Sequence, residues 1–237
     1  MFEELTGYRH EHKYIESEAD LTAAASRLAA VMKRDPHLSP GKGCYNIRSL
    51  YFDDHFNTFL DENINGTDER IKWRLRMYDR STSYISLERK IRKADLIAKQ
   101  HCKISVDTCQ KLLSGTARIS SDNPDLLNVF IKESRTRLLR PVIIVVYDRT
   151  PFVCAEGNTR VTIDRNIRSS SETDAFFADR PLVSRPVLLA GQNLLEVKYD
   201  AFLPAYIMRT IEHGRMRRET FSKYALARRL PYDGRLL

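Results

Sequence analysis

Residues 69–79, ERIKWRLRMYD, alternate between apolar and cationic side chains. Lys72, Arg74 and Arg76 occupy every second position, and the residues between them are apolar. Because successive side chains of a strand point to opposite faces, this pattern predicts a strand with one cationic and one apolar face. Other segments repeat the alternation, with charged or polar groups sharing one face. These groups are Glu11 with Lys13, Glu88 with Lys90, Tyr147 with Arg149, and Glu196 with Lys198.

Hydrophobic periodicity and turn residues predict about eight strands, with helices between some of them. The strands are expected at 8–16, 44–53, 69–79, 83–93, 95–104, 141–153, 159–167 and 193–200. The helices are expected at 18–34, 105–115, 120–140, 203–214 and 218–230. Ser121 or Asp122 is the expected cap of the helix at 120–140, with Pro124 in its first turn. Since hairpins join several strands, the pattern favours an antiparallel sheet that is closed or nearly closed.

Two arrangements of this sheet fit the charged faces. In the first, the charged faces meet water, which is the commoner place for charges. In the second, the sheet closes, the charged faces line a narrow tunnel, and apolar residues such as Trp73 and Met77 pack against outer helices. Cations that face one another repel and are costly to desolvate. The second arrangement therefore requires a thin, densely negative ligand such as a chain of phosphates.

The composition is that of a folded protein with an excess of positive charge. The 237 residues include 39 Lys and Arg against 31 Asp and Glu, and the net charge of +8 suits an anionic partner. No apolar run approaches the roughly 18 residues of a membrane helix, and the first residues lack a secretory pattern, so we expect a cytoplasmic location. The four cysteines form no CxxC pair, which argues against a cysteine zinc site.

Eight short segments resemble, in order, the polyphosphate polymerase domain of the vacuolar transporter chaperone (VTC) family. They are YRHEHKY, IRSLYFDD, RIKWRLRMY, LERK, VVYDRTPF, RVTID, LLEVKY and FSKY, within about Tyr8 to Arg228. That family is one of the triphosphate tunnel metalloenzymes, as are the CYTH phosphatases. The resemblance implies an α+β fold, with an eight-stranded antiparallel barrel, a charged lumen and helices outside, formed by residues 1–237 as one domain. It also implies transfer of the γ-phosphate of ATP onto a growing polyphosphate chain, with Mn²⁺ or Mg²⁺ as cofactor.

The resemblance further implies roles for individual residues. The expected catalytic residues are Arg74, Arg76, Lys90 and Arg149. The expected phosphate-binding residues are Lys13, Lys72, Tyr147, Lys198, Ser222 and Lys223. The expected metal ligands are Glu196, Glu88 and Glu11. These residue types suit the chemistry, because guanidinium groups bind phosphate oxygens in pairs and carboxylates bind Mg²⁺ or Mn²⁺.

Some of these residues have a simpler explanation, and two other positions depart from the family pattern. Glu88 fits a cross-strand ion pair, Tyr147 fits a core tyrosine with a satisfied hydroxyl, and Ser222 fits a helix cap. Arg9 stands where the CYTH enzymes have the first of two glutamates, which favours a single metal ion. Thr220 stands where some polymerases have a lysine.

The expected function is that of an ATP-dependent polyphosphate polymerase, acting on ATP and polyphosphate or pyrophosphate. A hydrolase of triphosphate or nucleoside triphosphates in the same tunnel is the nearest alternative, and a nucleotidyl cyclase is more remote. A non-catalytic polyphosphate-binding module also fits. We expect no nucleic acid partner, because the strand aromatics fall on the apolar faces. The cationic residues 215–219, with Arg228 and Arg229, are either a solvated face or a docking surface for polyphosphate or a membrane protein.

Overall fold

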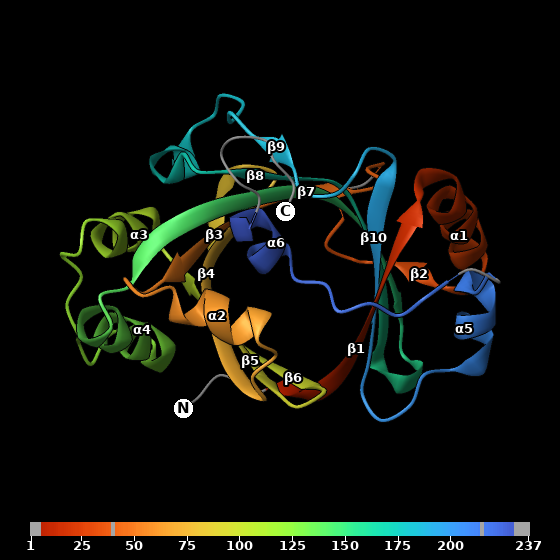
Figure 1. Cartoon of the computed structure of the whole chain (residues 1–237), viewed down its shortest axis with the longest axis horizontal. Helices are drawn as coiled ribbons and strands as arrows, with labels where there is room; N and C mark the ends of the chain where they lie inside the picture. Colours follow the sequence, from red (N-terminus) through yellow and green to blue (C-terminus); the bar gives the residue numbers. More distant parts are fainter. Residues whose placement is uncertain (1–5, 39–40, 214–215, 230–237) are drawn as a thin grey trace.

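The computed structural model describes residues 6–38, 41–213 and 216–229 and shows a closed barrel with helices outside it (Figure 1). The barrel strands are β1 (Thr6–Ser17), β3 (Tyr45–Asp53), β4 (Glu69–Tyr78), β5 (Ser81–Lys93), β6 (Leu96–Ile104), β7 (Arg140–Cys154), β8 (Thr159–Ser170) and β10 (Gln192–Tyr199). Their order around the wall is β7-β3-β4-β5-β6-β1-β10-β8, and β8 pairs back with β7. Every pairing is antiparallel, so the predicted eight-stranded antiparallel barrel is confirmed.

The remaining elements lie on or beside this wall. Two short strands, β2 (Lys33–Arg34) and β9 (Arg185–Pro186), extend the sheet at β7 and β8. The α-helices are α1 (Glu18–Val31), α2 (Thr58–Ile64), α3 (Val106–Leu113), α4 (Asp125–Thr136), α5 (Ala205–Ile211) and α6 (Lys223–Arg229), and the 3₁₀ helices are η1 (Glu156–Asn158) and η2 (Thr173–Phe177). In the described part of the chain, no helix is long and apolar enough to cross a membrane.

Several helix boundaries differ from the prediction. The first helix was expected to reach residue 34 but ends at Val31, because Lys33 and Arg34 pair with β7 instead. The helix expected at 120–140 begins after Pro124, which is its N-cap in place of Ser121 or Asp122. The helix expected at 218–230 begins only at Lys223, and residue 230 lies outside the described residues.

Helix α2 was not predicted, and two buried carboxylates explain why it forms. Asp54 accepts hydrogen bonds from the backbone amides of Phe56 and Thr58, at 3.1 and 2.9 Å. Asp53 accepts from the amides of Phe59 and Leu60, at 3.0 and 3.1 Å. These amides have no partner within the first turn of a helix, so the two aspartates stabilise its start. A helix of seven residues is too short for its hydrophobic periodicity to be recognised in the sequence.

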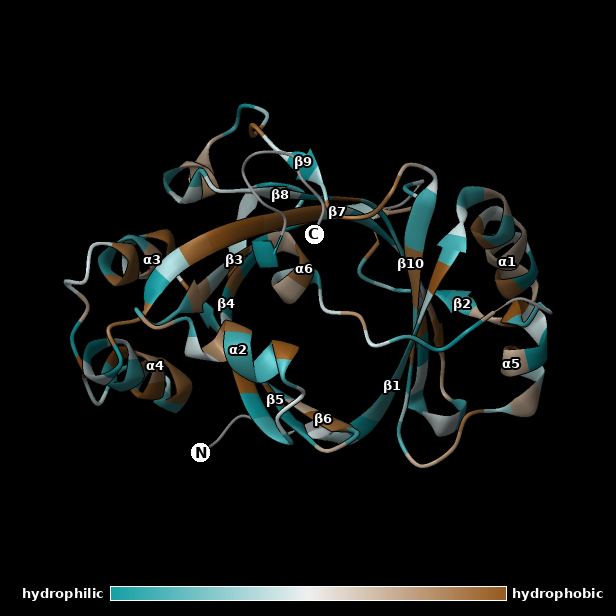
Figure 2. Cartoon of the chain, in the orientation of Figure 1, coloured by the Kyte–Doolittle hydropathy of each residue, from teal (hydrophilic) through white to brown (hydrophobic). Residues whose placement is uncertain are grey.

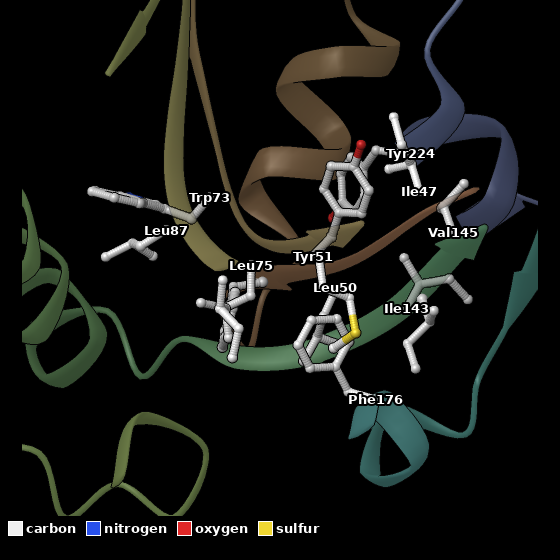
Figure 3. Packing of buried hydrophobic residues seen from close by; sticks show 14 of the residues in the cluster. Ile47, Leu50, Tyr51, Trp73, Leu75, Leu87, Ile143, Val145, Phe176 and Tyr224 are labelled. Atoms are coloured by element: carbon white, nitrogen blue, oxygen red, sulfur yellow. The ribbon is translucent and has the colours of Figure 1, made fainter. Parts of the chain in front are cut away.

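The apolar faces of the strands point outward, against the helices. Trp73, Leu75 and Met77 are at most 1% exposed, and Figure 3 shows Trp73 and Leu75 within the hydrophobic cluster. Trp73 packs edge-on against Phe130 of α4, and its indole Nε1 donates to Glu133 at 2.8 Å. Burying each such side chain contributes about 1.5–3 kcal/mol. The charged faces are therefore the inner ones, and the alternative of a charged face turned to water is wrong for this sheet.

The helices cover the wall in two groups, each with its own hydrophobic cluster. One cluster lies between β3–β7 and helices α2, α3, α4 and α6. It includes the long hydrophobic stretch of β7 that Figure 2 shows. The other lies between β1, β8, β10 and helices α1 and α5. Since the apolar residues are used outside the barrel, the inside is left to polar and charged groups.

Candidate active site

Three cavities follow one another inside the barrel. The middle one has a volume of about 60 Å³ and is lined by Arg74, Glu196 and Lys223, among others. A cavity of about 170 Å³ lies beside α2 and α6, and another of about 200 Å³ reaches Tyr45 at the start of β3. Lys90 lines all three, so we describe them together as one bore.

The structure brings the residues predicted from sequence together around this bore. Those that line it are Arg74, Arg76, Lys90, Arg149, Lys13, Lys72, Tyr147, Lys198, Ser222, Lys223, Glu196 and Glu11. Glu88 is 1% exposed and lies in the wall behind two arginines. The predicted site residues of the strands thus lie on the inner face of the wall, and Ser222 and Lys223 reach the bore from the start of α6.

Glu11 and Glu88 each hold several cations in the wall. Glu11 accepts from Lys13 at 3.0 Å and from Lys90 at 2.9 Å. Glu88 accepts from Arg74 Nε at 2.6 Å and Lys99 at 3.2 Å. Burial alone would raise the pKa of both carboxyls, but the surrounding cations hold it well below its usual range. Both therefore remain ionised and offset part of the positive charge of the bore.

A second group of charges joins β7, β8, β10 and α6. Arg149 binds Asp164 through two bonds of 2.6 Å and reaches Glu196 at 3.1 Å. Lys223 lies between the same two carboxylates, 2.7 Å from Asp164 and 2.8 Å from Glu196. Lys198 is 3.2 Å from Glu196. This group links three strands of the wall to the helix beside the bore.

The lysines of the bore are not fully compensated. Burial lowers the pKa of Lys90 to about 7, although Glu11 opposes the shift. The pKa of Lys72 is also well below its usual value, first because of burial and then because of Lys90 and Lys13. Within the described residues, the hydrogen-bond partner of the Lys72 ammonium is the Ser222 hydroxyl, at 2.9 Å, not a carboxylate. An anion in the bore would therefore add negative charge beside Lys72, which pairs with no carboxylate among the described residues.

Two phenols orient the paired arginines of β4. Arg76 donates to the Tyr147 hydroxyl at 3.1 Å and to Ser49 at 3.2 Å. Arg74 donates to the Tyr51 hydroxyl at 3.1 Å. Tyr147 is thus a buried tyrosine with a satisfied hydroxyl and a lining residue at once, so the two explanations of this residue are compatible. Bonds of this kind fix a guanidinium in place before a ligand arrives.

The sequence of residues 8–232 matches the VTC domain family. The chain belongs to this family. No curated protein sequence matches it. Among solved structures, HpAC1 of Hippeastrum, described as a candidate adenylyl cyclase with a dominant triphosphatase activity, shares 12% identity and a TM-score of 0.53 over 97% of each chain. This likeness shows the triphosphate tunnel fold.

Two further solved structures match with lower TM-scores. A candidate adenylate cyclase of Bacillus halodurans shares 13% identity, with a TM-score of 0.49, over 85% of this chain and 84% of that one. PH1819 of Pyrococcus horikoshii shares 14% identity, with a TM-score of 0.48, over 92% of this chain and 97% of that one.

The segment before α6 crosses the bore of this VTC domain and is held by lysines of the lumen (Figure 1). Lys13 Nζ donates to the carbonyl of Phe221 at 2.7 Å, and the amide of Glu219 donates to the carbonyl of Lys13 at 2.8 Å. Ser222 accepts from Lys72 and also from the amide of Ala225 at 3.2 Å. Ser222 is therefore both the helix cap and a lining residue.

The two positions that depart from the family pattern lie at the ends of the bore. Arg9 lines the cavity beside Tyr45 and pairs with Asp200 at 2.6 Å, away from Glu196. Thr220 lines the cavity beside α6. The number of metal ions in the bore stays a prediction from the sequence.

Among the described residues, Glu16, Asp20 and His213 lie close enough together to hold a metal ion, but they do not line the bore. Within the bore, the carboxylates suit a divalent cation best at one place. Glu196 and Asp164 lie on paired strands and share the Lys223 ammonium, so their oxygens already face one cation. Thr162 is paired with Glu196 across the same strands, and its buried hydroxyl has no hydrogen-bond partner among the described residues. Hard oxygen donors of this kind suit Mg²⁺ or Mn²⁺. Glu11 and Glu88 are likewise paired with lysines and arginines.

Sequence analysis missed several residues of the site. Asp164 is fully buried and binds both Arg149 and Lys223, yet it had been noted only as part of the RVTID segment. Arg160, Thr162 and Asp164 occupy every second position and so share one strand face, which was the available signal. Tyr51 and Lys99 were missed as well.

Two further arginines, Arg160 and Arg48, lie on opposite sides of the barrel wall. Arg160 lines the cavity beside Tyr45 and pairs with Asp35 at 2.6 Å. Arg48 lies outside the bore, where its guanidinium donates to carbonyls of η2 and Ala178. His10 borders the cavity beside Tyr45 and stacks on Tyr199, which packs against the hydrophobic cluster of α1 and α5 outside the barrel.

Proposed function

We propose that this VTC domain is an ATP-dependent polyphosphate polymerase. It transfers the γ-phosphate of ATP onto the end of a polyphosphate chain that lies in the bore. The terminal oxygen of the chain attacks the γ-phosphorus, a new phosphoanhydride bond forms, and the bond to the β-phosphate oxygen breaks to release ADP. The reaction needs no phosphorylated side chain.

One observation carries this proposal: the middle of the bore is narrow and strongly cationic. The cations that line it are Lys13, Lys72, Arg74, Arg76, Lys90, Arg149, Lys198 and Lys223. The carboxylates in and beside it are Glu196, Asp164, Glu11 and Glu88. Buried like charges repel strongly at this density, so the natural occupant is a linear polyanion. A wider cavity on each side leaves room for a donor on one side and a chain on the other.

The residues of the bore supply what phosphoryl transfer requires. Arg74 and Arg76 are fixed by tyrosine hydroxyls, so they are ready to bind oxygens of the transferred group. Arg149 is held by Asp164 in the same way. Lys90 and Lys72 act as point charges, and Lys90 gains a proton as phosphate enters. The protein thus contributes alignment and charge neutralisation, which are the main requirements of this chemistry.

A divalent cation fits beside Glu196 and Asp164. When bound, it would neutralise charge on the phosphate oxygens. Glu88 and Glu11, which the sequence also suggested as ligands, are better explained as counter-charges to their lysines and arginines.

A hydrolase of triphosphate or nucleoside triphosphates is the second candidate. It is favoured by the triphosphatase activity described for the Hippeastrum protein, whose fold is the same. The fold does not decide between the two, because water or a phosphate chain could accept the same group.

Product analysis separates these functions. The protein is incubated with ATP labelled at the γ-phosphate and Mn²⁺, and the products are resolved by gel and by nucleotide chromatography. Long acid-labile chains with an equal release of ADP support the polymerase. Free phosphate alone supports the hydrolase, cyclic nucleotide supports a cyclase, and binding without turnover supports a silent module. Arg76→Ala serves as the control for reaction inside the bore.

A cytoplasmic location, a membrane-protein partner and a single domain over residues 1–237 stay predictions from the sequence. Of the cationic segment 215–219, Arg215 lies outside the described residues. Arg218 lines a cavity of about 320 Å³ next to the bore, together with Lys13 and Arg92. A long polyphosphate leaving the bore on this side would meet further cations there.

A further inference from the structure

Lys223 occupies an unusual position for a phosphate-binding residue. Its ammonium is 2.7 Å from Asp164 and 2.8 Å from Glu196, and its side chain is 9% exposed. The ammonium of Lys223 is thus shared between the two carboxylates.

The Lys223 ammonium lies at the place in the bore where the carboxylates best suit a divalent cation. One oxygen of Asp164 and one of Glu196, on the paired strands β8 and β10, contact the same ammonium. Thr162 lies on the same strand pair, and its buried hydroxyl has no hydrogen-bond partner among the described residues. A divalent ion and the ammonium cannot both bind the same carboxylate oxygens closely, because they repel each other.

We propose that Lys223 is an internal counter-ion that is exchanged for the divalent cation, and that the exchange turns its ammonium toward phosphate. This inference rests on the proposed function, since it concerns the cofactor and substrate of the same bore. It also explains how one residue can neutralise carboxylates in the ligand-free protein and bind phosphate in the loaded one.

Helix α6 does not have to leave for this exchange to occur. Tyr224 donates to Asp53, and Arg228 donates to Asn57 at 2.6 Å. Phe221, Tyr224 and Ala227 belong to the hydrophobic cluster. These contacts hold the helix independently of Lys223, whose long side chain can rotate while the backbone stays in place. The Lys223 ammonium also lies 4.9 Å from the centre of the Tyr147 ring, so a cation–π contact can stabilise it as it turns from the carboxylates toward phosphate.

The test measures metal binding directly, without ATP. Free Mn²⁺ is followed by electron paramagnetic resonance during titration of the wild type, Lys223→Gln, Lys223→Arg and Lys72→Gln. Lys223→Gln should bind Mn²⁺ at least about 10-fold more tightly than the wild type, because a competing charge is gone. Lys223→Arg should bind it no more tightly than the wild type. Lys72→Gln also removes a lysine of the bore, but one without a carboxylate partner in the described residues, and should change the affinity by less than about 3-fold.

A second measurement uses the unmodified protein, so it does not depend on whether a variant folds. Acetylation of lysines is mapped by mass spectrometry with and without Mn²⁺. Lys223 should become more reactive when Mn²⁺ is present. Lys111, which is exposed and pairs with Asp107 on α3, should not change.

Three results would overturn the inference. They are equal or weaker Mn²⁺ binding by Lys223→Gln, an equal gain in Lys72→Gln, and unchanged acetylation of Lys223 on addition of Mn²⁺. A failed polymerase assay with a positive result here would instead refute the proposed function alone, because the counter-ion exchange is measured without turnover.

Discussion

Replacing Asp164 by asparagine should destabilise the ligand-free protein and strengthen its response to polyphosphate. Asp164 is fully buried and neutralises Arg149 and Lys223 through contacts of 2.6 and 2.7 Å. Asparagine has nearly the same shape but no charge, so the two cations would lose one of their two shared counter-charges. Glu196 would remain as the other.

The size of the effect follows from this geometry. Removing one partner of a buried ion pair costs about 3–5 kcal/mol, because an uncompensated charge stays buried. For a chain of this length each kcal/mol lowers Tm by about 2–4 °C, so we expect a loss of about 6–20 °C. Tripolyphosphate at 100 times its Kd stabilises a protein by about 2.7 kcal/mol. If the freed cations of the variant raise its affinity about 10-fold, the same ligand concentration adds about 1.4 kcal/mol more.

The assay is thermal unfolding followed by circular dichroism, with and without tripolyphosphate, in EDTA. Asp148→Asn is the matched control, because Asp148 is on the same stretch of wall but faces outward, where it accepts from Asn46 and Asn166. That variant should show the same ligand response as the wild type. The reasoning is refuted if Asp164→Asn melts with the wild type, or if tripolyphosphate stabilises it no more than it stabilises Asp148→Asn.

Three further predictions concern other parts of the wall. Because the pKa of Lys90 is about 7 when the bore is free, binding of polyphosphate at pH 8 should take up about one proton at this site, and affinity should fall as pH rises above 7. Calorimetry in EDTA with two buffers of different ionisation enthalpy measures the uptake, which should be smaller by about one proton in Lys90→Arg. Arg76→Lys should lower kcat/KM for ATP by about 10- to 100-fold, since lysine cannot replace the planar contacts, whereas Arg89→Lys on the outer face should leave the rate unchanged. Trp73→Phe should cost about 1–3 kcal/mol of unfolding free energy in urea through loss of the bond to Glu133, with unchanged affinity for tripolyphosphate; a fall in that affinity would contradict the outward placement of Trp73.

The strand faces could be predicted from sequence because the period of a strand is fixed. Once Lys72, Arg74 and Arg76 are known to alternate with apolar residues, a single choice of inside and outside places every side chain of β4. In β1, β5 and β10, a Glu and a Lys also lie on one face of the strand. The same choice of inside and outside therefore fits these three strands as well as β4. What the pattern could not supply was the pairing across the bore, because that depends on strand order and register, and these come from contacts far apart in the chain.

Two of the misses originate in such long-range contacts. Asp164 looked like one acid in a mixed strand, and its role appears only when β7 and α6 bring Arg149 and Lys223 to it. The start of α6 likewise depends on Ser222 being held by Lys72, about 150 residues earlier in the chain. A buried carboxylate is stable only with cations around it, and cations at this density are stable only with an anion between them. The two requirements meet in the same bore, so the residues that stabilise its ligand-free state should also set how strongly it attracts phosphate.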